Sequence, residues 1–206
     1  MLRGENCQEY MICATVLELD QCERIRDVLV PLLLPGQTKL HWTDEQSKRR
    51  REIAKSISAL GCHHVIVSTL SQESRKTERY RRKCLERLYY EVSEMKISRV
   101  TLESRQKTQN QKDIEHIVAL QGSGLYRDIR LKHINGSDEP LLWIPDVVLG
   151  MYNATFRGEQ QYWREFERKV VCHGVKRQNV CLIRVVFTLW AGETLMLRSR
   201  REGVRG

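Results

Sequence analysis

Short apolar runs that alternate with longer amphipathic segments are the feature that most constrains the fold of this chain. Continuous apolar runs of strand length occupy residues 10–17 and 63–70, and further strands are expected at 97–103 and 125–134. Helical spacing of apolar residues predicts helices over residues 20–34, 44–60, 74–95, 112–120 and 139–151. This alternation predicts an α/β domain with a largely parallel sheet.

The ends of the predicted helices carry capping and stop residues. Asp20 with Glu23, and Thr43 with Gln46, have the spacing of a capping box at the start of the first two helices. Gly61 predicts the end of the second helix.

The length of 206 residues fits one domain of ordinary size. We assign residues 1–170 to that domain. Residues 171–206 contain one strand-like run, at 180–190, and end in a cluster of arginines. They are therefore expected to form a basic C-terminal appendage.

No apolar run approaches the roughly 18 residues that a membrane-spanning helix needs, and the N-terminus lacks the apolar core of a signal peptide. These absences predict a cytoplasmic protein without a membrane partner. The seven cysteines include no C-x-x-C pair and no spacing typical of a zinc site. Their odd number also argues against a disulfide framework, so reduced, structural cysteines are expected.

The chain carries a net charge of +9, with an isoelectric point near 9.3. Such an excess favours a polyanionic partner, and nucleic acid, either DNA or RNA, is the first candidate. Basic runs without matching acidic blocks favour a surface that follows a phosphate backbone, although each run could also be a solvated helix face. The runs are Arg79 to Lys83, the terminal arginines, and Lys48, Arg49, Arg50 and Arg51.

Two carboxylates and a histidine occupy positions where chemistry is often found. Glu103 ends a predicted strand, where α/β sheets place functional groups, and a solvated carboxylate is the alternative. Asp146 lies in the most hydrophobic helix, where it faces a metal, a cation or a polar cleft, or else caps the helix after Pro145. His41, beside Trp42 in a loop before a helix, is either structural or catalytic.

Three segments of the chain carry a resemblance to a known family: Leu32 to Trp42, Leu102 to Arg105, and Glu139 to Asp146. Together they resemble a large bacterial family of unknown function with an RNase H-like fold, close to the retroviral integrase and RuvC-type superfamily. The resemblance extends over residues 10–166 and implies a mixed sheet flanked by helices. The third segment is similar to the closing helix of that family, and Glu103 matches the acid at its strand end.

The resemblance also implies a metal-dependent nuclease. RNase H-like nucleases hold two divalent cations with a cluster of carboxylates and hydrolyse a phosphodiester. Glu103, Asp146 and Asp113 would then bind Mg²⁺ or Mn²⁺, although Asp113 could instead cap its own helix. His41 would orient a water or a phosphate. Arg105 and the run from Lys48 to Arg51 would hold the nucleic-acid backbone.

The chain departs from this family at its N-terminus. The family begins with a strand whose Asp-Glu-Ser-Gly motif supplies the central metal ligand, and this chain starts almost directly at what would be the second strand. The first strand is therefore expected to be missing, through a late start codon, loss of the strand or a non-catalytic ancestry. Its loss would expose the edges of its neighbours and lower stability. The alternative function is a non-catalytic nucleic-acid-binding or interaction module of a mobile-element or defence system.

Overall fold

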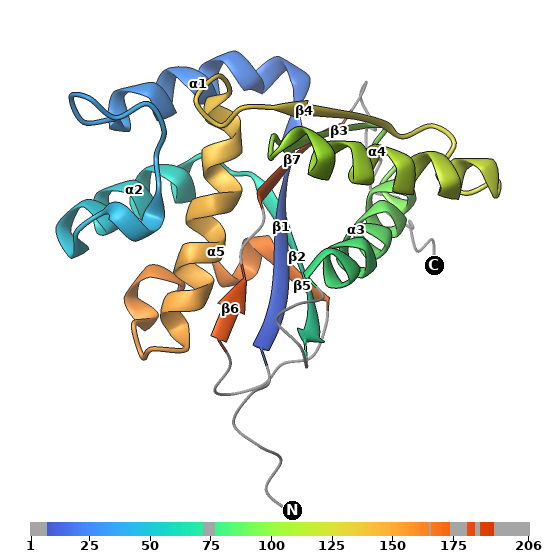
Figure 1. Ribbon diagram of the computed structural model, residues 1–206. Coiled ribbons are helices and arrows are strands. Elements are labelled where there is room, and N and C mark those ends of the chain that lie inside the picture. The colour runs from blue at the N-terminus through green and yellow to red at the C-terminus, as the bar shows by residue number, and fades with distance from the viewer. Residues whose placement is uncertain (1–7, 72–76, 165, 174–180, 184–185, 192–206) are drawn as a thin grey trace, which may run out of the picture.

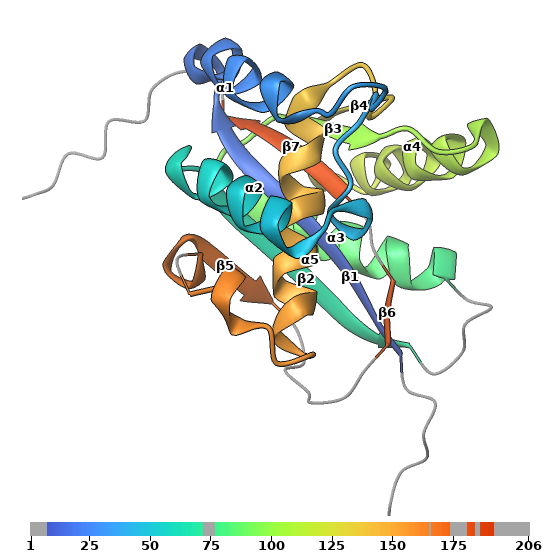
Figure 2. The ribbon, with the colours of Figure 1, turned by 90° about the vertical axis from the view of Figure 1, so that its left-hand side faces the viewer.

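Helices cover both faces of one sheet in the computed structural model, which describes residues 8–71, 77–164, 166–173, 181–183 and 186–191 (Figures 1 and 2). The helices are α1 (Cys22–Leu29), α2 (Ser47–Ala59), α3 (Thr77–Glu94), α4 (Lys107–Gly122) and α5 (Trp143–Thr155). The strands are β1 (Gln8–Glu18), β2 (His63–Ser71), β3 (Arg99–Glu103), β4 (Arg130–Ile134), β5 (Val170–His173), β6 (Cys181–Ile183) and β7 (Val186–Ala191).

The sheet is mixed, with the strand order β4-β3-β7-β1-β2-β5, and β6 also pairs with β1. Its longest ladder joins β1 to β2 and is antiparallel, so the expectation of a largely parallel sheet is wrong for this pair. The number of helices between strands explains the directions. Two helices separate β1 from β2, whereas one helix separates β3 from β4, and those two strands run parallel.

Alternating side chains of the strands divide the interior into two hydrophobic layers. On β1, Tyr10, Ile12 and Ala14 contact the layer under α3 and α4. Met11 and Cys13 belong to the opposite layer, under α1, α2 and α5. Figure 2 shows α2 and α5 in front of the sheet and α3 behind it.

The two predicted capping boxes are wrong. Asp20 lies inside a 3-10 turn (Leu19–Gln21), and the residue before α1 is Gln21, which makes no side-chain cap. Thr43 likewise lies inside a 3-10 turn (Trp42–Asp44), and α2 follows Gln46, again without a cap. The physical reason is the same at both sites: a short turn precedes each helix and takes up the residue expected to cap it. The predicted stop at Gly61 is confirmed, because Gly61 has a φ of 75° directly after the end of α2.

The segment expected to be a C-terminal appendage contributes strands to the sheet. Strand β7 lies between β1 and β3, parallel to β1 and antiparallel to β3. The backbone edges of β1 and β3 are therefore paired, in contrast to the open edges expected from the missing first strand. Strand β5 pairs with β2 at the far end of the sheet.

Helix α5 crosses β1, β2 and β7 and is buried along most of its length. Gly150 permits this position, because a Cβ atom there would overlap the indole of Trp42. Trp42 in turn makes an edge-to-face contact with Tyr162, with the ring centroids 5.1 Å apart. This packing fixes the loop that carries His41 against α5.

Candidate functional site

The loop from residue 39 to residue 42 brings two of the predicted acids into one region. Lys39 of this loop contacts Glu103 at the end of β3, and His41 faces Asp146 in the first turn of α5. The three residues predicted to be catalytic, His41, Glu103 and Asp146, therefore lie around a single loop. They come from a loop, a strand and a helix that are distant in sequence.

Glu103 is ion-paired with a lysine of the chain itself. The Nζ of Lys39 donates to Oε1 of Glu103, and both side chains are largely shielded from solvent. Gly136 lies beside this pair: a Cβ atom at Gly136 would be 2.5 Å from Oε1 of Glu103 and 2.8 Å from the Lys39 side chain. The indole Nε1 of Trp143 donates to the Gly136 carbonyl oxygen at 2.6 Å. Gly136 therefore leaves the space that the Lys39–Glu103 ion pair occupies, and any side chain at this position would overlap the pair.

Asp146 is 3% exposed and bonds to the loop that carries His41. Its Oδ2 accepts a hydrogen bond from the backbone N–H of Trp42 at 3.1 Å and lies 3.9 Å from Nδ1 of His41. The interpretation of Asp146 as a cap of α5 is wrong, because α5 starts at Trp143 and its N-cap residue is Leu142. Pro145 lies in the first turn, where a proline leaves the helix intact.

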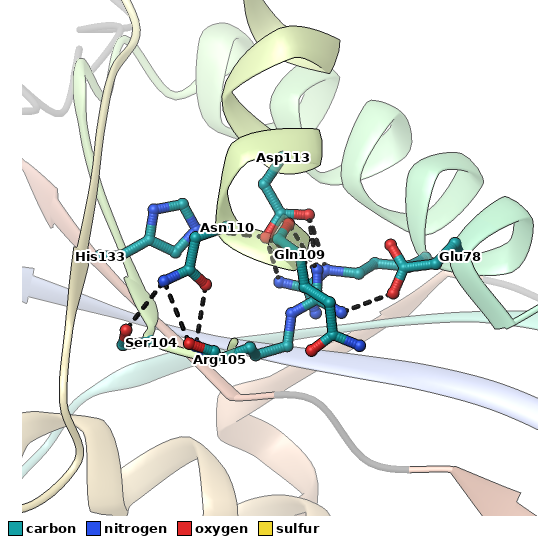
Figure 3. Close-up of polar contacts among 8 residues, drawn as sticks. Glu78, Ser104, Arg105, Gln109, Asn110, Asp113 and His133 are labelled. Carbon is teal, nitrogen blue, oxygen red and sulfur yellow. Dashed lines mark hydrogen bonds and ion pairs between the residues drawn. The ribbon is translucent and has the colours of Figure 1, made fainter. Parts of the chain in front are cut away.

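Asp113 lies in a different place, in a buried network on the α4 side of the sheet. Its two carboxylate oxygens accept two hydrogen bonds from Arg81, each of 2.8 Å, and further ones from Arg105 at 3.1 and 3.2 Å. Nε2 of His133 lies 3.2 Å from Oδ2 (Figure 3). Burial by itself would raise the pKa of Asp113, but the hydrogen bonds from Arg81 and His133 outweigh it and hold the pKa well below its usual range.

The three predicted metal ligands are not brought together. Glu103 contacts Lys39 and Gly136 near α5, whereas Asp113 contacts Arg81 of α3 and His133 of β4. Across the part of the chain that the structure describes, no three or more His, Cys, Asp or Glu side chains form a group that could hold a metal ion.

Two of the predicted nucleic-acid contacts, Arg49 and Arg50, bond to other groups of the protein. Arg49 donates to the Leu32 carbonyl oxygen and lies 3.5 Å from a carboxylate oxygen of Glu45. Arg50 donates to the carbonyl oxygens of Trp42 and Thr43, at 3.0 and 3.2 Å, and its guanidinium lies over the Trp42 ring. Both arginines therefore fix the loop that precedes α2.

Arg105 is also engaged within the protein. Its Nη1 donates to Glu78 at 2.6 Å, and its Nη2 contacts Asp113 and the Gln109 carbonyl oxygen (Figure 3). By contrast, Lys48 and Arg51 are exposed, and neither has an ion pair with any residue that the structure describes. Among the described residues, these two of the five predicted backbone contacts have no partner that competes with a phosphate.

Sequence reasoning missed Lys39 and Arg81 as members of these clusters. Arg81 belongs to the run from Arg79 to Lys83, which was expected either to follow a phosphate backbone or to be a solvated helix face, but Arg81 is 1% exposed. A signal was present: Arg81 precedes Leu85, Leu88 and Val92 at helical spacing, on the buried side of α3. Nothing in the sequence pairs Lys39 with Glu103, because the contact depends on the path of a loop.

No protein-family model, curated protein or solved structure matches this chain. The chain is a mixed α/β protein whose sheet is covered by helices on both faces. Among the residues that the structure describes, no helix combines the length and the apolar character needed to cross a bilayer. Four of the cysteines, Cys13, Cys22, Cys62 and Cys84, are buried, and Cys172 is exposed.

Proposed function

We propose that this chain is a non-catalytic nucleic-acid-binding protein built on an RNase H-like sheet. The order of elements supports the relationship to that fold: an antiparallel β1–β2 pair precedes the parallel β3 and β4, and α5 closes one face. Strand β7 departs from it, because a C-terminal strand occupies the middle of the sheet.

The observation that carries this proposal is the ion pair between Lys39 and Glu103. A two-metal nuclease needs carboxylate oxygens that are open to Mg²⁺, which is a hard cation with oxygen ligands. Here the ammonium group of Lys39 already neutralises Glu103, and Asp146 is bonded to the Trp42 backbone. Asp113 is bonded to two arginines in another layer. The residues of the cluster do not fit a two-metal centre, and we derive no hydrolytic step from them.

Charge supports nucleic acid as the partner. The net charge is +9, and internal ion pairs leave this excess unchanged because each of them joins one cation to one anion. Exposed cations such as Lys48 and Arg51 carry part of this charge, and neither has an ion pair or a side-chain hydrogen bond to a described residue. Exposed cations of this kind release counterions from a phosphate backbone on binding.

Fluorescence anisotropy tests the proposal, with labelled single- and double-stranded DNA and RNA titrated in salt from roughly 50 to 200 mM. We expect binding whose logarithm falls linearly with the logarithm of salt concentration, and intact oligonucleotides after incubation with Mg²⁺ or Mn²⁺. Absence of binding at low salt would overturn the proposal. Metal-dependent cleavage that an Asp146→Asn variant abolishes would instead establish the nuclease.

A charge-matched pair of variants tests the α2 surface. Replacing Lys48 and Arg51 by Gln removes two exposed cations, and we expect the salt slope on duplex DNA to fall by about 2, since each lost phosphate contact removes about 0.9. Replacing Lys107 and Lys112 of α4 by Gln removes the same charge from the opposite layer and serves as the control. Equal losses in both variants would mean that net charge, and not this surface, determines binding.

A further inference from the structure

A groove lies on the face of β3 and β4 that α5 leaves uncovered. Helix α5 crosses β1, β2 and β7, and β4 forms the end of the sheet beyond them (Figure 1). The groove has a volume of about 350 Å³ and is open to solvent. Its described lining consists of Arg99, Val100, Thr101, Arg130, Leu131 and Lys132.

The parallel register concentrates basic side chains in this groove. Arg99 of β3 pairs with Arg130 of β4, and Thr101 pairs with Lys132. Residues paired in register point to the same face of a sheet, so the three cations share one side. Arg99, Arg130 and Lys132 are all exposed, and Thr101 is buried.

These three cations are not neutralised by the described parts of the protein. None of them has an ion pair with a described residue, and the described lining of the groove contains no carboxylate. Arg130 is held in place through its Nη1, which donates to the Arg127 carbonyl oxygen at 2.8 Å. Like charges opposite each other on neighbouring strands destabilise a sheet, and an anion in the groove would relieve this repulsion.

We propose that this groove binds phosphate groups of the nucleic-acid backbone, an inference that rests on the proposed function. Guanidinium groups bind phosphate through paired N–H donors, and a lysine ammonium adds a point charge. The groove also leads toward the candidate site. Glu103 follows Thr101 by two residues on β3 and points to the same face, so the Lys39–Glu103 pair lies beyond one end of the groove.

The test replaces Arg99 and Lys132 by Gln in the full chain, with the Lys107→Gln and Lys112→Gln double variant as the charge-matched control. Anisotropy titrations against salt measure binding to duplex DNA, and calorimetry measures binding of tripolyphosphate. We expect the groove variant alone to lose about 2 from the salt slope, and to lose tripolyphosphate binding. If the double variant does not melt like the wild type, Lys132→Gln alone should lose about 1.

The outcomes distinguish a failure of the groove proposal from a failure of the proposed function. If the wild type binds DNA and the groove variant keeps its full salt slope, the groove is not the phosphate site, and the proposed function stands. If the wild type binds tripolyphosphate through these residues but binds no nucleic acid, the groove takes free polyphosphates or nucleotides, and the proposed function fails. Binding of neither ligand overturns both proposals.

Discussion

At the scale of single residues, burial changes the pKa of a histidine in the sheet, His64. His64 on β2 is 1% exposed, and its Nδ1 lies 3.0 Å from the hydroxyl oxygen of Thr15 on β1. Burial lowers the pKa of His64 to about 3, with smaller effects from His63 and Lys169. The folded protein therefore keeps this imidazole neutral at a pH where the unfolded chain would protonate it.

We expect the free energy of unfolding to fall as the pH drops from 6.5 toward 3, the ordinary and the lowered pKa of His64. In that window the unfolded chain binds one proton that the folded chain does not, which costs about 1.4 kcal/mol per pH unit. Urea unfolding at about pH 7, 6 and 5 measures this loss.

The chain has six histidines, so a Thr15→Val and His64→Phe double variant serves as the reference for His64. Its stability should fall less steeply than that of the wild type. Identical slopes for the two proteins between about pH 7 and pH 5 would contradict the assignment.

Residue identity alone predicted part of the candidate site. Glu103 and Asp146 stand out in the sequence because each carboxylate follows or interrupts an apolar run, and both do lie around one loop. Their partners could not be predicted. Lys39 reaches Glu103, and the Trp42 N–H reaches Asp146, across sequence separations of 64 and 104 residues. Contacts over such distances depend on the packing of whole elements.

Among the elements, α5 depends most on a close approach. Gly150 lies against the Trp42 indole, where a Cβ atom would overlap the ring. We expect Gly150→Ala to lower the free energy of unfolding by about 1–3 kcal/mol, because an extra methyl group in a filled interior displaces its neighbours. Chemical denaturation of the purified variant measures this change.

Gly122 provides the matched control for that substitution. It lies in the last turn of α4, and a Cβ atom there would meet nothing within 4 Å. Gly122→Ala should leave stability unchanged or raise it by up to about 1 kcal/mol, since alanine is the better helix former. A Gly150→Ala variant that behaves like Gly122→Ala would show that Trp42 moves aside at no cost.

The elements themselves were predictable where apolar periodicity is strong. β1 and β2 lie close to the predicted ranges because they are continuous apolar runs, and α3 does so because its buried residues recur with the period of a helix. Helix α4 begins at Lys107, five residues before the predicted start, because its first turns are polar and carry no apolar period. Helix starts were predicted poorly because 3-10 turns precede α1 and α2.

At the scale of the whole molecule, β7 joins the two parts of the sheet. Six residues of β1, from Cys13 to Glu18, pair with β7, and four residues of β3, from Arg99 to Leu102, pair with it on the other side. Sequence reasoning located a strand in this region but not its place in the sheet. Strand order depends on long-range pairing, which a local pattern does not encode.

Truncation tests the role of β7. A chain that ends after Ile183 lacks β7, and we expect it to lose its cooperative melt and to aggregate. Two strand edges then lose their partners, and each buried unpaired backbone group costs about 1–3 kcal/mol, against a total stability of about 5–15 kcal/mol. A chain that ends after Ala191 keeps β7 and serves as the control. Circular dichroism melts and size-exclusion chromatography compare the two. Equal melting of both truncations would show that β7 is dispensable.

The position of β7 also sets an order of events during synthesis. A ribosome produces β1, β2, β3 and β4 well before it produces β7, and yet β7 is the strand that stands between β1 and β3. The nascent chain consequently carries two incomplete parts of the sheet with open edges until β7 leaves the exit tunnel. Domains usually fold from the N-terminus as they emerge, but this one cannot complete its sheet until β7 has emerged. It therefore spends its synthesis in a form that chaperones recognise and that pairs readily with other nascent chains.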